Sequence, residues 1–191
     1  MVCHIVAIPK TKDLEIIDNL RSYIYQNDFR FKNKPLSSDT HITLAEIDIK
    51  ASEIQELKNA LLAISIEMPF HITNKEWILT KENKEPNYKY ANPYTWIALK
   101  FPQRKKLYQQ VDDLTKRLGV NNNEKYISDV KKIEKTESEY IGNHINLSNY
   151  TRRERSEECW QYFNKNLPMD IAFDTLALRN LDGSHLFEIK Y

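Results

Sequence analysis

Two short stretches of the chain carry residue types suited to acid–base chemistry near neutral pH. The first is THITLAEI, residues 40–47, and the second is HINLS, residues 144–148. Histidine has an ordinary pKa near neutral pH, so it can accept or donate a proton there. In each stretch a histidine, His41 or His144, stands two residues before a hydrogen-bond donor, Thr43 or Asn146.

The first stretch is expected to form a β-strand. Successive side chains of a strand point to opposite faces, so His41 and Thr43 would lie side by side on one face. Ile42, Leu44 and Glu46 would lie on the other face, where the apolar residues fix the strand in a core. The imidazole and the hydroxyl would then be held together rigidly.

The second stretch is expected to form a strand of the same kind. By the same alternation, His144, Asn146, Ser148 and Tyr150 would share one face. Asn146 can donate a hydrogen bond as a hydroxyl does, although its side chain is larger. Ser148 could supply a hydroxyl, and Tyr150 is the aromatic residue expected at the rim of the site.

The elements expected around the two stretches occur in the same order in both halves of the chain. Each half shows a strand ended by a proline, a helix, the histidine strand, a second helix, and a strand begun by a proline. This repeat of pattern makes His41 and His144 equivalent positions. Two lobes related by a pseudo-twofold axis would bring the two histidine strands together at a central cleft.

On these residues the chain resembles the 2H phosphoesterase superfamily, which includes 2′,5′ RNA ligase-like enzymes and 2′,3′-cyclic nucleotide phosphodiesterases. The signature of that superfamily is one His-apolar-Thr/Ser-apolar motif in each lobe. Residues 41–44, HITL, match this motif fully, and residues 144–147, HINL, depart from it at Asn146. The resemblance extends over nearly the whole chain through the order of the elements.

The resemblance implies a bilobal, duplicated α+β fold with two antiparallel sheets around a central cleft and helices on the outside. The whole chain, residues 1–191, would be one domain, with lobe 1 at about 1–80 and lobe 2 at about 94–191; an exchange of termini between the lobes is left open. It also implies a phosphodiester reaction without metal or cofactor. His41 and His144 would act as general acid and base, while Thr43 and Asn146 bind non-bridging phosphate oxygens.

Two other groups of residues compete for a functional role. His71-Ile72-Thr73 also begins like the motif, but His71 has no partner motif in the repeat, so a solvated strand face is expected for it. Tyr88, Tyr90, Tyr94 and Trp96 could form a stacking platform for a nucleobase. The alternative is loop anchoring and core packing, which is slightly favoured for Tyr94 and Trp96.

The composition limits the remaining classes of function. The chain has 191 residues, of which 41% are hydrophobic and 29% are charged, and its net charge is +1; unspecific nucleic-acid binding through charge alone is not expected. Two cysteines without metal-like spacing suggest a reducing, cytoplasmic location. The three glycines form no phosphate-binding loop, and no apolar stretch reaches the length of a membrane span. A monomer is expected.

The sequence leaves the activity and the substrate open. The first hypothesis is a phosphodiesterase acting on a nucleotide, an oligonucleotide or an RNA end, with a 2′,3′-cyclic phosphate, a 2′,5′ linkage or a signalling oligonucleotide as substrate. The second is a nucleotide-binding module that Asn146 has made inactive, and the third is a purely structural duplicated domain. Specificity would depend on the expected loops at 29–39, 80–93 and 120–141.

Overall fold

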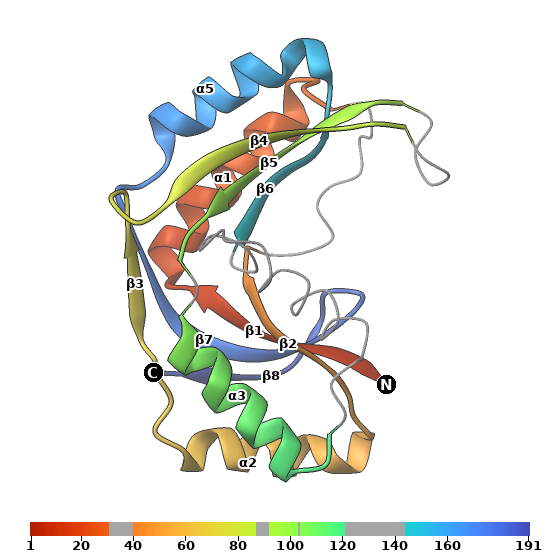
Figure 1. The fold of residues 1–191 in the computed structure, drawn as a ribbon, viewed down its shortest axis with the longest axis vertical. Helices are drawn as coiled ribbons and strands as arrows, with labels where there is room; N and C mark the ends of the chain where they lie inside the picture. Colours follow the sequence, from red (N-terminus) through yellow and green to blue (C-terminus); the bar gives the residue numbers. More distant parts are fainter. Residues whose placement is uncertain (31–39, 87–91, 103, 121–143) are drawn as a thin grey trace.

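The computed structural model describes residues 1–30, 40–86, 92–102, 104–120 and 144–191. It is an α+β structure in which helices alternate with strands of two antiparallel sheets (Figure 1). The elements in chain order are β1 (Val2–Pro9), α1 (Thr11–Gln26), β2 (Ile42–Asp48), a 3₁₀ turn (Ala51–Glu53), α2 (Ile54–Ala63), β3 (Phe70–Thr73), β4 (Ile78–Lys84), β5 (Tyr94–Lys100), α3 (Lys105–Arg117), β6 (His144–Thr151), a 3₁₀ turn (Arg153–Arg155), α5 (Ser156–Asn166), β7 (Asp170–Asn180) and β8 (His185–Lys190).

The larger sheet, here called sheet A, has five strands in the order β2-β1-β7-β3, and β8 also pairs with β7. The long strand β7 lies along β1 and pairs with β3 near its start and with β8 further on. The smaller sheet, sheet B, has the order β4-β5-β6. Every pairing is antiparallel.

Each sheet is covered by a helix that the chain forms directly after a strand of the other sheet. Helix α1 follows β1 of sheet A and contacts it, but it also contacts β6 and α5, and α5 contacts β4 of sheet B. Helix α3 follows β5 of sheet B but contacts β2 of sheet A, while α2 contacts β8 and α3. Figure 1 shows α5 and α1 with sheet B, and α2 and α3 beneath sheet A.

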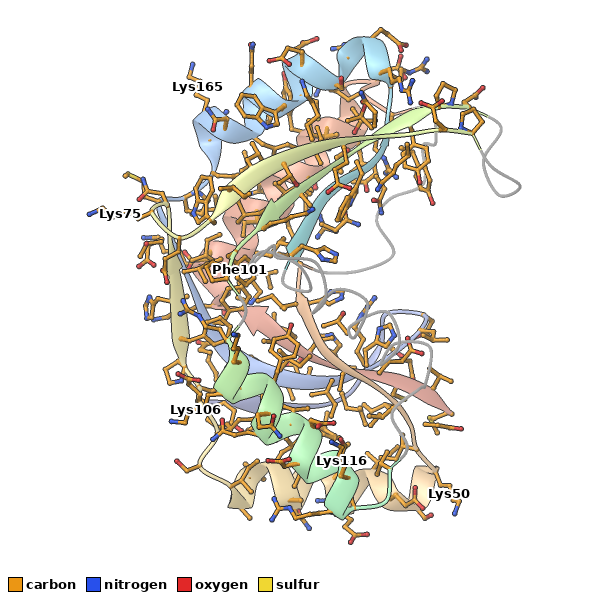
Figure 2. All side chains as sticks on the ribbon, viewed as in Figure 1. Lys50, Lys75, Phe101, Lys106, Lys116 and Lys165 are labelled. Carbon is orange, nitrogen blue, oxygen red and sulfur yellow. The ribbon has the colours of Figure 1, made fainter. Side chains whose placement is uncertain are left out.

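A cluster of phenylalanines joins the two sheets through the protein core. Phe101 follows β5 directly and lies in the middle of the molecule, between β5 and α3 (Figure 2). Its ring centroid lies 6.4 Å from that of Phe173 in β7, and Phe173 stacks on Phe70 of β3 at 4.7 Å. Phe101 and Phe173 are fully buried, so this contact removes two large apolar side chains from water.

The two sheets are not formed separately by residues 1–80 and residues 94–191. The C-terminal strands β7 and β8 belong to sheet A with β1 and β2, and β4 belongs to sheet B. Residues 80–84, expected at the start of a loop, continue strand β4 because they pair with residues 94–98 of β5. Residues 87–91 of that loop lie outside the described residues, as do most of the other two loops.

Candidate functional site

The first motif lies at the start of β2. The strand begins at Ile42, which is opposite Ala7 of β1, and Thr43 is opposite Val6. His41 directly precedes the strand, and both His41 and Thr43 are half-buried. The phenol of Tyr108 in α3 donates a hydrogen bond of 3.0 Å to the carbonyl oxygen of Thr43. Helix α3 therefore holds the backbone of the motif in place.

The prediction that Glu46 and Thr43 lie on different faces of the strand is wrong. The register of β1 and β2 shifts between Ile5 and Val6, so residue 44 is an extra residue in β2. Such a bulge reverses the alternation of faces beyond it. Glu46 is consequently paired with His4, on the face that also carries Thr43, and its carboxylate lies 3.2 Å from His4 Nε2.

The second motif lies at the start of β6. His144 is opposite Lys100 of β5, and Asn146 is opposite Ala98. No register shift separates these two pairs, so His144 and Asn146 lie on one face, as the sequence predicts. That face also carries Trp96, because residues 96, 98 and 100 alternate regularly in their pairing with β4.

Trp96 contacts both functional residues of the second motif. Its indole Nε1 donates to Asn146 Oδ1 over 3.2 Å. Its ring lies edge-on to the His144 imidazole, with centroids 5.1 Å apart and planes at 87°. The ammonium groups of Lys84 and Lys100 lie 5.5 and 5.4 Å from the centroid of the indole ring. The sequence reading favoured packing for Trp96 and missed these contacts, because nothing in the motif points to residue 96.

Glu82 of β4 organises the cations around this indole. It lies opposite Trp96, and its two carboxylate oxygens accept hydrogen bonds from Lys84 and Lys100. These ionic hydrogen bonds lower the pKa of Glu82 against the opposing effect of desolvation, which is the largest single influence on it. The carboxylate stays charged near neutral pH and keeps both ammonium groups beside the ring.

Ser148 does not share the face of His144, contrary to the prediction. A shift of register between Ile97 and Ala98 places Ser148 opposite Ile97, a core residue. Ser148 is fully buried, and its hydroxyl lies 2.7 Å from that of Thr151. Burial raises the pKa of the neighbouring Cys159 thiol to about 12, although hydrogen bonds with Thr151 and Ser148 oppose that effect. Ser148 therefore belongs to an internal polar cluster under helix α5.

Tyr150 lies near the end of β6, away from His144. Its backbone φ of 58° is in the left-handed region, within a stretch where the register with β5 shifts again. The ring tilts against that of Tyr94 at a centroid distance of 5.0 Å. The Arg30 guanidinium lies 5.6 Å from the Tyr150 ring, and Arg30 Nε donates to the carbonyl of Asn149. Tyr150 thus extends the aromatic face of Trp96 and Tyr94; Tyr88 and Tyr90 lie outside the described residues.

Both histidine strands begin where the two sheets meet. His144 is opposite Lys100, the residue before Phe101. In sheet A, Ile42 is opposite Ala7, two residues before Pro9, and Pro9 is opposite Phe173. Since Phe101 packs on Phe173, the starts of β2 and β6 both adjoin this contact, and Figure 1 shows them near the middle of the molecule.

The pKa of His144 is lowered from its ordinary value. Desolvation by the surrounding side chains is the main cause, although the residue keeps an exposed surface at the start of the strand. The positive charge of Lys100 lowers the pKa further, and the negative charge of Glu82 opposes it. The neutral imidazole is therefore the dominant form at pH 7, which suits a general base.

Replacing Lys100 with methionine is expected to raise the pKa of His144. The change removes the positive charge that disfavours the imidazolium and leaves Glu82, which favours it. Titration of the ring protons by NMR checks this. In the wild type the His144 midpoint should lie below 6.5, and the variant should titrate at a higher pH than the wild type. An unchanged midpoint in the variant would contradict the role given to Lys100.

The rival histidine is placed as the sequence predicts. His71 lies in β3, and its side chain is 58% exposed. Its Nδ1 lies 3.3 Å from a carboxylate oxygen of Asp170 on the neighbouring strand. His71 therefore belongs to a solvated strand face, which makes it a useful control for the other two histidines.

Comparison with known proteins assigns the chain to no family. No family model matches the sequence, and no curated protein matches it significantly. Within the described residues, no group of three or more His, Cys, Asp and Glu side chains is arranged to hold a metal ion. None of the helices in that part of the chain is both long and apolar enough to cross a membrane.

Proposed function

We propose that the protein is a phosphodiesterase of the 2H type, acting on a nucleotide, an oligonucleotide or an RNA end. The observation that carries the proposal is the similar placement of the two histidines. Each stands at the start of a strand adjoining the contact between the sheets, and a hydrogen-bond donor, Thr43 or Asn146, follows it two residues later. In this proposal the two motifs face one phosphate in a cleft between two lobes.

The two imidazoles would divide the proton transfers of hydrolysis. For a 2′,3′-cyclic phosphate, His144 takes a proton from the attacking water as a P–O bond forms. His41 gives a proton to the leaving ribose oxygen as the bond between that oxygen and phosphorus breaks. The Thr43 hydroxyl and the Asn146 amide donate to the non-bridging oxygens, on which negative charge gathers in the transition state. The reaction needs no metal in this scheme, and a monomer suffices for it.

The second candidate is a binding module that has lost the reaction, and the specific observation in its favour is Asn146. The amide stands where the family motif has Thr or Ser. Its larger size could move a bound phosphate away from the line of attack. The second candidate keeps the affinity for nucleotides and predicts that Asn146→Thr gains activity.

A panel of substrates in the presence of EDTA tests the proposal. The panel contains a 2′,3′-cyclic nucleotide, a 2′,5′-linked dinucleotide and its 3′,5′-linked isomer, with products separated by chromatography and binding followed by calorimetry. The proposal predicts turnover of the cyclic or the 2′,5′-linked compound without added metal. Binding without turnover would support the second candidate instead, and the absence of both would refute the two together.

A further inference from the structure

We infer that Trp96 is the positioning residue that makes Asn146 a phosphate-binding donor, an inference that rests on the proposed function. Trp96 lies outside both motifs and in a different strand from Asn146. Its indole contacts both His144 and Asn146.

The indole of Trp96 sets the orientation of the Asn146 amide. An indole N–H is a donor only, so the Asn146 atom that faces it must be the carbonyl oxygen. The hydrogen bond of 3.2 Å therefore fixes which end of the amide lies toward Trp96. The NH₂ end is left to point away from the indole, where it can donate to a phosphate oxygen.

An amide that binds an anion needs a fixed orientation, whereas a hydroxyl does not. A threonine or serine hydroxyl rotates its hydrogen to suit the acceptor, so it can donate in many settings. An amide carries an acceptor at one end and donors at the other. If the amide turned by about 180°, its oxygen lone pairs would face the anion. Asn146 thus requires a partner that selects one orientation, and Trp96 supplies it.

The indole of Trp96 is itself held in place by its neighbours. Lys84 and Lys100 lie close to its ring, and Glu82 holds both lysines. The ring is therefore held between fixed neighbours and can maintain both the hydrogen bond to Asn146 and the edge contact with His144.

The test is a double-mutant cycle with Trp96→Phe and Asn146→Thr. Phenylalanine keeps an aromatic ring and removes the N–H, so kcat/KM is expected to fall about tenfold, a change typical of one hydrogen bond. In the Asn146→Thr background the same change should have much less effect, because a hydroxyl needs no such partner. Equal losses in both backgrounds would overturn the inference.

Trp160 provides the matched control. Its indole Nε1 also donates one hydrogen bond, of 3.1 Å, to the carbonyl oxygen of Leu79, and it lies on helix α5. Trp160→Phe removes the same chemical group elsewhere and should leave kcat/KM unchanged. A loss like that of Trp96→Phe would show a general effect of losing an indole hydrogen bond and would overturn the inference.

A binding readout separates this inference from the proposed reaction. Inorganic phosphate is titrated into the protein, and the side-chain NH₂ signals of Asn146 are followed by NMR, with Asn146→Thr used to assign them. The wild type and Trp160→Phe should show phosphate-dependent shifts, and Trp96→Phe should lose them. Shifts of equal size in Trp96→Phe, or none in the wild type, would contradict the role of Trp96 even if turnover is observed.

Discussion

Replacing either His41 or His144 with asparagine is expected to lower kcat by at least about a hundredfold, the lower end of what one general acid or base contributes. Asparagine keeps a polar side chain of similar reach but cannot exchange a proton near neutral pH. If both histidines act on the same phosphate in one concerted step, the double variant should be scarcely less active than either single variant, because the loss of either proton transfer already blocks that step. Steady-state hydrolysis of the best substrate of the panel measures this.

His71→Asn is the matched control for these variants. His71 begins the sequence His-Ile-Thr, as the first motif does, but it lies exposed in β3 beside Asp170. Its replacement should leave kcat unchanged. Wild-type turnover in the His41 or the His144 variant would refute the assignment of that histidine.

The pH dependence assigns the two roles. A general base must be neutral to act, and the pKa of His144 is lowered by its surroundings. The rate of the wild type should therefore rise with pH through a midpoint below 6.5. This rising limb should move to higher pH in Lys100→Met, since that change raises the pKa of His144.

Replacing Phe173 with alanine is expected to lower the free energy of unfolding by about 3–5 kcal/mol, the range for deleting a buried phenylalanine ring. Phe173 is fully buried, and its ring contacts Phe70 of sheet A and Phe101 beside sheet B. The truncation removes apolar burial and leaves a cavity at the junction of the sheets. Urea denaturation followed by circular dichroism measures the loss.

Leu62→Ala is the control for the effect of truncation alone. Leu62 lies in α2 and is 57% exposed, so its replacement should change the stability by less than about 0.5 kcal/mol. A loss of unfolding free energy below about 1 kcal/mol for Phe173→Ala would contradict the account of the core, because deleting a ring packed between two sheets should destabilise the fold by more than that.

Local patterns in the sequence were sufficient to predict several elements. The apolar spacing in residues 103–118 predicts a helix, and α3 spans Lys105–Arg117. A glycine directly after a helical pattern predicts its C-terminal cap, and Gly119 forms one, with a φ of 66° and a hydrogen bond from the Val120 N–H to the Thr115 carbonyl oxygen. The face of His144 and Asn146 and the exposure of His71 were also predicted correctly, because regular alternation holds at those positions.

Other features depend on contacts between distant parts of the chain. The faces of Glu46 and Ser148 were predicted wrongly because one residue is inserted in each strand against its partner, and a bulge is set by the pairing of two strands. Strands β7 and β8 likewise join sheet A through long-range pairing, because β7 pairs with β1 and β8 pairs with β7. The roles of Trp96 and Glu82 follow from cross-strand neighbours in sheet B, which no motif within a single stretch reveals.

A crystal structure with a bound, non-hydrolysable dinucleotide would test the central claim most directly. That claim is that His41 and His144 act on one phosphodiester. The account predicts that one ring nitrogen of each histidine lies within about 2.6–3.2 Å of oxygens of the same phosphoryl group. A phosphoryl group held by only one of the two imidazoles, or bound away from both, would contradict it.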